Sequence, residues 1–303
     1  MPLPPKMHAM LARPREDLIE PVSSMLANYV HPTQNAPQRV RDGLRSVMRS
    51  ITDDDWTSYV EYLVQLGADW GRQDAHPVGR AMTAALLEPL LTPESRLDGV
   101  EHLESAAGTP NRRVLVVGNH LSYVDPTAAW ALLHRQGKPE LADRCTAVAG
   151  PKVYEGEPMR LMGASANHTI KVAQSSQLTT NAAGLGPRDL VRITRQSMKV
   201  AGDLMDMGRI LVIYPEGTRS RTGELGPFLK AVGRWLTMDG ALLVPFGLRG
   251  TDSIYTLEDD RLRTTRISGR FGQALDPHKM MQQGASRDDV VDATRQAVAE
   301  LLA

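Results

Sequence analysis

From about residue 96 onward, short runs of apolar and β-branched residues alternate with longer segments of helical periodicity. Such alternation predicts an α/β domain built around a mostly parallel mixed sheet that is flanked by helices. We expect strands over 113–117, 146–149, 169–172, 209–214, 241–247 and 265–271. We expect helices over 125–134, 187–207, 228–238 and 286–302.

The region before this pattern predicts a small N-terminal helical domain. Residues 15–88 have few glycines and no strand-like alternation, and the clearest helix lies over 52–70. Thr52 can cap that helix, and its aromatic stripe is typical of a helical-bundle core. Two prolines then interrupt the helical pattern, so we expect a helical domain over 1–91 and an α/β domain over 92–303.

Composition excludes several classes of protein. The 35 Lys and Arg residues balance 35 Asp and Glu residues, so the chain lacks the positive excess that drives non-specific nucleic-acid binding. A single cysteine, Cys145, excludes an internal disulfide framework and a thiolate metal cluster. No apolar stretch approaches the roughly 18 residues of a spanning helix. We therefore expect a cytoplasmic protein, with a polar mobile loop over 174–187.

The run RVLVVGNHLSYVDP places a histidine and an aspartate directly after an apolar strand. Ligands bind at such strand ends in α/β sheets. A loop or a first helical turn can bring Asp125 beside His120, where it would hold one ring nitrogen and leave the other to accept a hydroxyl proton. This spacing is also common by chance, and a helix-capping aspartate beside a structural histidine is the alternative interpretation.

A second predicted strand runs directly into PEGTRSR, residues 215–221. Gly217 permits close backbone approach, and Glu216 can hold an arginine or a hydroxyl group. Arg219 and Arg221 alternate, so their guanidiniums can converge on one phosphate. The alternative interpretation is a charged surface turn.

Together the two motifs resemble those of the glycerolipid acyltransferase family, which includes lysophosphatidate and glycerol-3-phosphate acyltransferases. NHLSYVD matches the His-x4-Asp block of that family, and YPEGTRS matches its Phe-Pro-Glu-Gly-Thr-Arg-Ser block with Tyr214 in place of Phe. The resemblance extends over about residues 90–275. A preceding helical domain without a membrane span is most similar to the soluble plastid-type enzymes.

The resemblance implies an O-acyltransferase of phospholipid biosynthesis. It would move a fatty acyl group from acyl-CoA or acyl carrier protein to a hydroxyl of glycerol-3-phosphate or a lysophospholipid, with no acyl-enzyme, metal or cofactor. His120 would be the general base, and Asp125 would orient it. The residues that would bind the acceptor and its phosphate are Glu216, Gly217, Thr218, Arg219, Arg221 and Lys152. Handling lipids would also imply peripheral contact with the inner membrane surface.

The chain departs from the family pattern in two places. Members often carry an arginine or clustered lysines after the strand that here reads HTIKV, whereas residues 173–176 are Ala, Gln, Ser and Ser. The segment after the second motif is lengthened over 228–233. Two alternatives therefore stay open. One is an O-acyltransferase with a non-phosphorylated acceptor, and the other is a non-catalytic lipid-binding protein on the same fold.

Overall fold

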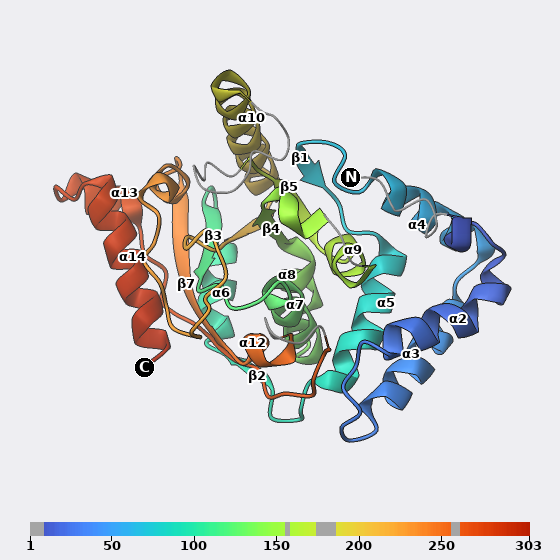
Figure 1. Ribbon diagram of the computed structural model, residues 1–303. Coiled ribbons are helices and arrows are strands. Elements are labelled where there is room, and N and C mark those ends of the chain that lie inside the picture. The colour runs from blue at the N-terminus through green and yellow to red at the C-terminus, as the bar shows by residue number, and fades with distance from the viewer. Residues whose placement is uncertain (1–8, 155–157, 174–185, 256–260) are drawn as a thin grey trace.

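The computed structural model describes residues 9–154, 158–173, 186–255 and 261–303 (Figure 1). Within these ranges one eight-stranded sheet has the strand order β1-β5-β4-β6-β3-β7-β8-β2. The strands are β1 (Gly71–Gln73), β2 (Arg96–Asp98), β3 (Arg113–Gly118), β4 (Cys145–Ala149), β5 (His168–Lys171), β6 (Ile210–Ile213), β7 (Ala241–Arg249) and β8 (Ser268–Phe271).

The centre of the sheet is parallel and both edges are mixed. Strands β5, β4, β6, β3 and β7 are parallel to their neighbours in that order. At one edge β1 is antiparallel to β5, and near the other β8 is antiparallel to β7 and parallel to β2. The predicted α/β fold with a mostly parallel mixed sheet is confirmed.

Helices precede and flank this sheet. The α-helices are α2 (Arg15–Ala27), α3 (Ala36–Ser50), α4 (Asp53–Gln65), α5 (Pro77–Leu87), α6 (Val100–Ala107), α7 (Asp125–Arg135), α8 (Pro139–Arg144), α9 (Pro158–Ser165), α10 (Pro187–Asp206), α11 (Gly233–Leu236), α12 (Thr251–Ile254), α13 (Pro277–Gln282) and α14 (Arg287–Leu301). The described residues also form short 3₁₀ helices at η1 (Glu88–Leu90), η2 (Pro151–Tyr154) and η3 (Lys230–Val232). None of the helices in the described ranges is both long and apolar enough to cross a bilayer.

Two hydrophobic cores lie on opposite faces of the sheet. Successive side chains of a strand point to opposite faces, so Val116 and Val117 of β3 enter different cores. The core around Val116 includes side chains of α2 to α8, whereas the core around Val117 includes side chains of α10, α11 and α14. Figure 1 shows α14 beside β7 at one side of the molecule and α2 to α5 at the other.

The predicted helix cap at Thr52 is confirmed. Its hydroxyl accepts a hydrogen bond from the Asp55 N–H (3.1 Å), and the Asp55 carboxylate accepts one from the Thr52 N–H (2.9 Å), which makes a capping box. Trp56 and Tyr59 are buried, so the aromatic stripe is core. Helix α4 ends at Gln65, earlier than the sequence pattern indicates.

The prediction of a helix over 228–238 is wrong. Only η3 and the four-residue α11 form there. Phe228 is buried in the core beneath α10 and α14, and the Leu229 N–H donates to the Pro215 carbonyl oxygen (2.9 Å). These tertiary contacts hold the first residues of the segment against the second motif, and a helix begun at Phe228 would break them.

The sequence pattern does not predict strands β1 and β2. Each has three residues, and β1 lies within the region expected to be entirely helical. The division into domains at residue 92 stays a prediction. One hydrophobic core nevertheless crosses that position, from Met48 and Met82 to Leu132. The expected mobile loop over 174–187 lies almost wholly outside the described residues.

Close packing of α5 against α9 generates a stability prediction. A Cβ on Gly79 would lie 2.3 Å from Ser165 Oγ and 2.9 Å from the Ser165 carbonyl oxygen. The Ser165 hydroxyl is already held, 3.0 Å from the Tyr59 hydroxyl and donating to the Met162 carbonyl oxygen (2.7 Å). We expect Gly79→Ala to lower the free energy of unfolding by about 1–3 kcal/mol, measured by urea denaturation.

Gly163→Ala is the matched control for that variant. It lies in α9, where an added Cβ meets nothing within 4 Å, so it should leave stability unchanged or raise it by about 0.5–1 kcal/mol. Equal unfolding free energies for the two variants would contradict the close contact.

Candidate active site

The structure brings the two sequence motifs to one edge of the sheet. Strands β3 and β6 are parallel neighbours, with Val117 paired to Ile213, so the loops that follow them lie side by side. The Ser220 N–H of the second motif donates to the carbonyl oxygen of His120 in the first (2.7 Å). Residues far apart in the chain therefore share one site.

His120 and Asp125 form a hydrogen-bonded pair. The distance from His120 Nδ1 to Asp125 Oδ2 is 2.8 Å, and Asp125 opens helix α7 with no exposed surface. An ionised carboxylate only accepts hydrogen bonds, so Nδ1 carries a proton and the lone pair lies on Nε2. Among the described residues, Nε2 has no hydrogen-bond partner, and 17% of the side chain is exposed. Nε2 can therefore accept a proton from a bound molecule.

Three further groups compensate the buried charge of Asp125. The backbone N–H groups of Leu121 and Ser122 donate to it at 2.8 and 3.0 Å, and the Thr251 hydroxyl donates to Oδ1 at 2.5 Å. A buried carboxylate that lacks such partners is costly. Thr251 follows β7 and is separated from Asp125 by 126 residues, so no local pattern in the sequence could identify it.

Tyr214 supports the histidine ring. The two rings stack with centroids 4.7 Å apart and planes at 20°. Burial, and then the charge of Asp125, raise the pKa of Tyr214 well above its ordinary value, so the phenol stays protonated. Its hydroxyl has no hydrogen-bond partner among the described residues. The ring therefore limits the orientations open to His120.

Glu216 connects the motifs through the backbone. It is 8% exposed, and its two carboxylate oxygens accept from the N–H groups of His120 (2.8 Å) and Gly226 (2.9 Å). The turn that follows needs the left-handed conformation at Gly217, where φ is +69°. Glu216 thus holds the backbone of the histidine in place, and its contact with an acceptor stays a prediction.

The three predicted cationic residues differ in their contacts with the site. The Arg219 guanidinium lies over the ring of Tyr123, 4.0 Å from its centroid, and Tyr123 belongs to the first motif. Arg221 and Lys152 are exposed, and no contact within the described part of the chain ties either to the site. The structure therefore joins Arg219 alone of the three to the His120 loop.

Asn119 also supports the site, although the two sequence motifs do not predict a role for it. Its side-chain amide donates to the Leu248 carbonyl oxygen (2.9 Å) and accepts from the Leu248 N–H (2.8 Å), which fastens the first motif to the end of β7. Asn119 is 1% exposed. Its place immediately before His120 is the one sequence signal that could have identified it.

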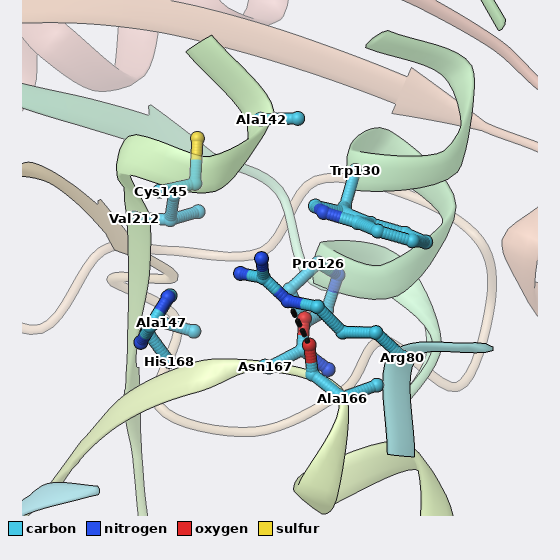
Figure 2. A pocket seen from close by; sticks show the side chains of 10 residues that line it. All are labelled: Arg80, Pro126, Trp130, Ala142, Cys145, Ala147, Ala166, Asn167, His168 and Val212. Atoms are coloured by element: carbon cyan, nitrogen blue, oxygen red, sulfur yellow. Dashed lines mark hydrogen bonds between the residues drawn. The ribbon is translucent and has the colours of Figure 1, made fainter. Parts of the chain in front are cut away.

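A small cavity lies where α5, α7 and α8 pack against β4, β5 and β6 (Figure 2). Its volume is about 30 Å³, and Arg80 crosses it to donate to the Ala166 carbonyl oxygen (3.3 Å). Cys145 and His168, which begin β4 and β5, line it. Burial raises the pKa of the Cys145 thiol to about 12 and lowers the pKa of His168 to about 4, so both are uncharged near pH 7. The cavity has room for about one water molecule and does not admit a lipid.

A larger pocket of about 420 Å³ is lined by Leu121, which follows His120 in the chain, and by Leu248, whose backbone is bound by the Asn119 side chain. Apolar side chains form much of its wall, and charged side chains accompany them. The apolar lining residues are Leu121, Leu225, Leu248, Ala299 and Leu302, and the charged ones are Glu224, Arg249 and Asp252. Such a pocket suits a molecule with an apolar part and a polar end.

Comparison with known proteins identifies the family. Residues 95–249, just over half of the chain, match the sequence profile of the Acyltransferase family. A 1-acyl-sn-glycerol-3-phosphate acyltransferase of Chlamydomonas reinhardtii is 26% identical over 198 residues, which are 64% of this chain and 49% of that protein. This chain thus spans about half the length of that relative.

A solved structure was also matched. The crystal structure of the 1-acyl-sn-glycerophosphate acyltransferase PlsC of Thermotoga maritima covers 94% of this chain and 99% of its own, at 16% identity and a TM-score of 0.45. The profile match includes both the His-x4-Asp motif and the Pro-Glu-Gly-Thr-Arg motif that meet at the carboxyl edge of the sheet. By that match, this chain belongs to the acyltransferase family.

Proposed function

We propose that this protein transfers a fatty acyl group from a thioester, acyl-CoA or acyl carrier protein, to a hydroxyl of glycerol-3-phosphate or a lysophospholipid. The observation that carries the proposal is the 2.8 Å His120–Asp125 pair, with the carboxylate fully buried and Nε2 left to accept a proton. The 1-acyl-sn-glycerol-3-phosphate acyltransferase among the relatives supports the choice of acceptor.

The proposed reaction needs one proton-accepting group and no nucleophilic side chain. His120 Nε2 removes the acceptor's hydroxyl proton while the oxygen attacks the thioester carbonyl carbon. The resulting tetrahedral intermediate collapses, the carbon–sulfur bond breaks, and the imidazolium returns the proton to the leaving thiolate. Asp125 keeps the imidazole in the required tautomer and stabilises its charged form. The products are an ester and a free thiol.

His120→Ala tests the base directly. We expect turnover to fall about 10²- to 10⁴-fold, because the proton acceptor is lost, while the fold is retained. Release of free thiol from acyl-CoA in the presence of acceptor measures the rate, and circular dichroism measures the fold. His278→Ala, which removes an exposed histidine, is the control and should leave the rate unchanged. Near-normal turnover of His120→Ala would contradict the mechanism.

Asp125→Asn in the same assay should lower turnover and stability together. An amide nitrogen would face some of the N–H and hydroxyl donors that now bind the carboxylate. Loss of stability without loss of turnover would contradict the orienting role of Asp125.

Arg219 is the proposed contact for the acceptor phosphate. Its guanidinium stacks on Tyr123 and has no ion pair among the described residues. We expect Arg219→Ala to lower kcat/KM for a phosphorylated acceptor about 10- to 150-fold with the donor KM nearly unchanged, since charge-assisted hydrogen bonds contribute about 1.5–3 kcal/mol. Arg219→Lys should not restore activity, because an ammonium lacks the planar fork of a guanidinium.

Arg221→Ala is the companion variant and should act less strongly, because Arg221 is exposed. A rise in the donor KM alone would assign Arg219 to the phosphates of the donor. In that case the acceptor need not be phosphorylated.

The 420 Å³ pocket is the proposed site of the acyl chain, because Leu121, the residue after the proposed base, lines it together with three other leucines. Ala299→Phe should fill it and lower the rate with long-chain acyl donors more than with short-chain donors. The ratio of kcat/KM for a long-chain and a short-chain acyl-CoA measures this effect. Gln296→Phe places the same side chain on an exposed position of α14 and should leave the ratio unchanged. Equal ratios in the two variants would exclude this pocket.

A further inference from the structure

A second arginine lies against the same aromatic ring as Arg219. Arg160, in helix α9, places its guanidinium carbon 5.1 Å from the centroid of the Tyr123 ring, where the carbon of Arg219 lies at 4.0 Å. The two guanidinium carbons are therefore no more than 9.1 Å apart, the sum of these distances. Two positive charges from different elements thus share one side chain of the His-x4-Asp loop.

No acidic group of the described chain neutralises this pair. Neither Arg160 nor Arg219 forms an ion pair with a described residue, and Arg160 Nε is buried without a hydrogen-bond partner there. Buried donors without partners and neighbouring like charges both cost free energy. An anion bound between the two side chains would remove both costs.

Lys171, the cation at the end of the HTIK strand, contacts residues of the N-terminal region. It is 8% exposed, its ammonium donates to the Gly67 carbonyl oxygen, and it lies 4.5 Å from the ring centroid of Trp70. These contacts hold it against the N-terminal region. Arg160 and Arg219 are the two arginines that the described structure places against the Tyr123 ring of the first motif.

We propose that Arg160 and Arg219 together bind the phosphate of the acceptor, with Tyr123 holding their guanidiniums in position. This assignment rests on the proposed function. Hydrogen bonds of about 2.7–2.9 Å from two guanidiniums to one phosphate put the guanidinium carbons roughly 8 Å apart, a separation within the upper limit that the two ring contacts set. Stacking leaves the N–H edge of a guanidinium available for such bonds.

The position of the pair favours the acceptor over the donor. Tyr123 lies between His120 and Asp125 in the motif loop, and Ser220, next to Arg219, is hydrogen-bonded to His120. A phosphate held here would place the attached hydroxyl groups near the base. A phosphomonoester carries close to two negative charges near pH 7, which two guanidiniums match.

Steady-state kinetics of Arg160→Gln tests the assignment. With lysophosphatidate as acceptor, KM should rise about tenfold or more, while kcat and the donor KM stay within about twofold. With monoacylglycerol, which lacks the phosphate, the variant should match the wild type. Arg160→Lys should recover only part of the loss. Arg234→Gln, at an exposed arginine of α11, is the matched control and should change neither KM.

A double-mutant cycle tests whether the two arginines bind the same phosphate. A binding measurement separates failure of this inference from failure of the proposed function. If both arginines bind one phosphate, the effects of Arg160→Gln and Arg219→Gln on KM should be non-additive. A raised lysophosphatidate KM in Arg219→Gln but not in Arg160→Gln would overturn this inference and leave the proposed function standing.

If the wild type acylates no phosphorylated acceptor, the proposed function is wrong. Calorimetric titration with glycerol 3-phosphate then tests whether Arg160 and Arg219 form an anion-binding site. Weaker binding by Arg160→Gln than by the wild type supports an anion site. Equal binding, or no binding by the wild type, overturns it. Matching melting temperatures show that Arg160→Gln is folded.

Discussion

The buried carboxylate of Asp125 is the constraint on which the site depends. A charge without exposed surface needs donors around it, and these come from the ring of His120, the backbone of Leu121 and Ser122, and the hydroxyl of Thr251. Thr251 follows β7, so the carboxyl ends of β3 and β7 must be adjacent. The parallel pairing of these strands from Arg113 to Gly118 meets that requirement.

The same sheet edge makes two remote motifs a single unit. Glu216 accepts a hydrogen bond from the His120 N–H across 96 residues of sequence, and Ser220 donates one to the His120 carbonyl oxygen. Asn119 adds the end of β7 through its two bonds to Leu248. The histidine is thus held by its backbone as well as by its ring, which limits the positions open to Nε2.

The central strands were predictable because each is an apolar run with β-branched residues. The runs at 113–117 and 209–214 became β3 and β6 with changes at their ends only. Edge strands β1 and β2 were missed because three residues carry too little pattern, and their pairing partners lie far away in the chain. The segment from Phe228 has helical periodicity, but burial of Phe228 and the bond from Leu229 to Pro215 decide against a long helix.

The sequence alone determined the fold class, through the alternation of strand-like and helix-like segments, and it determined the His120–Asp125 pair. A short loop that ends at a helix start can bring these two side chains together without contacts to the rest of the chain. Tertiary structure alone decided what surrounds the pair. Contacts between remote elements place Thr251 against Asp125, two arginines against Tyr123, and Lys171 against Gly67. Such contacts form where the sheet and its two cores place those elements side by side. The local periodicity of the sequence does not predict which remote elements become neighbours.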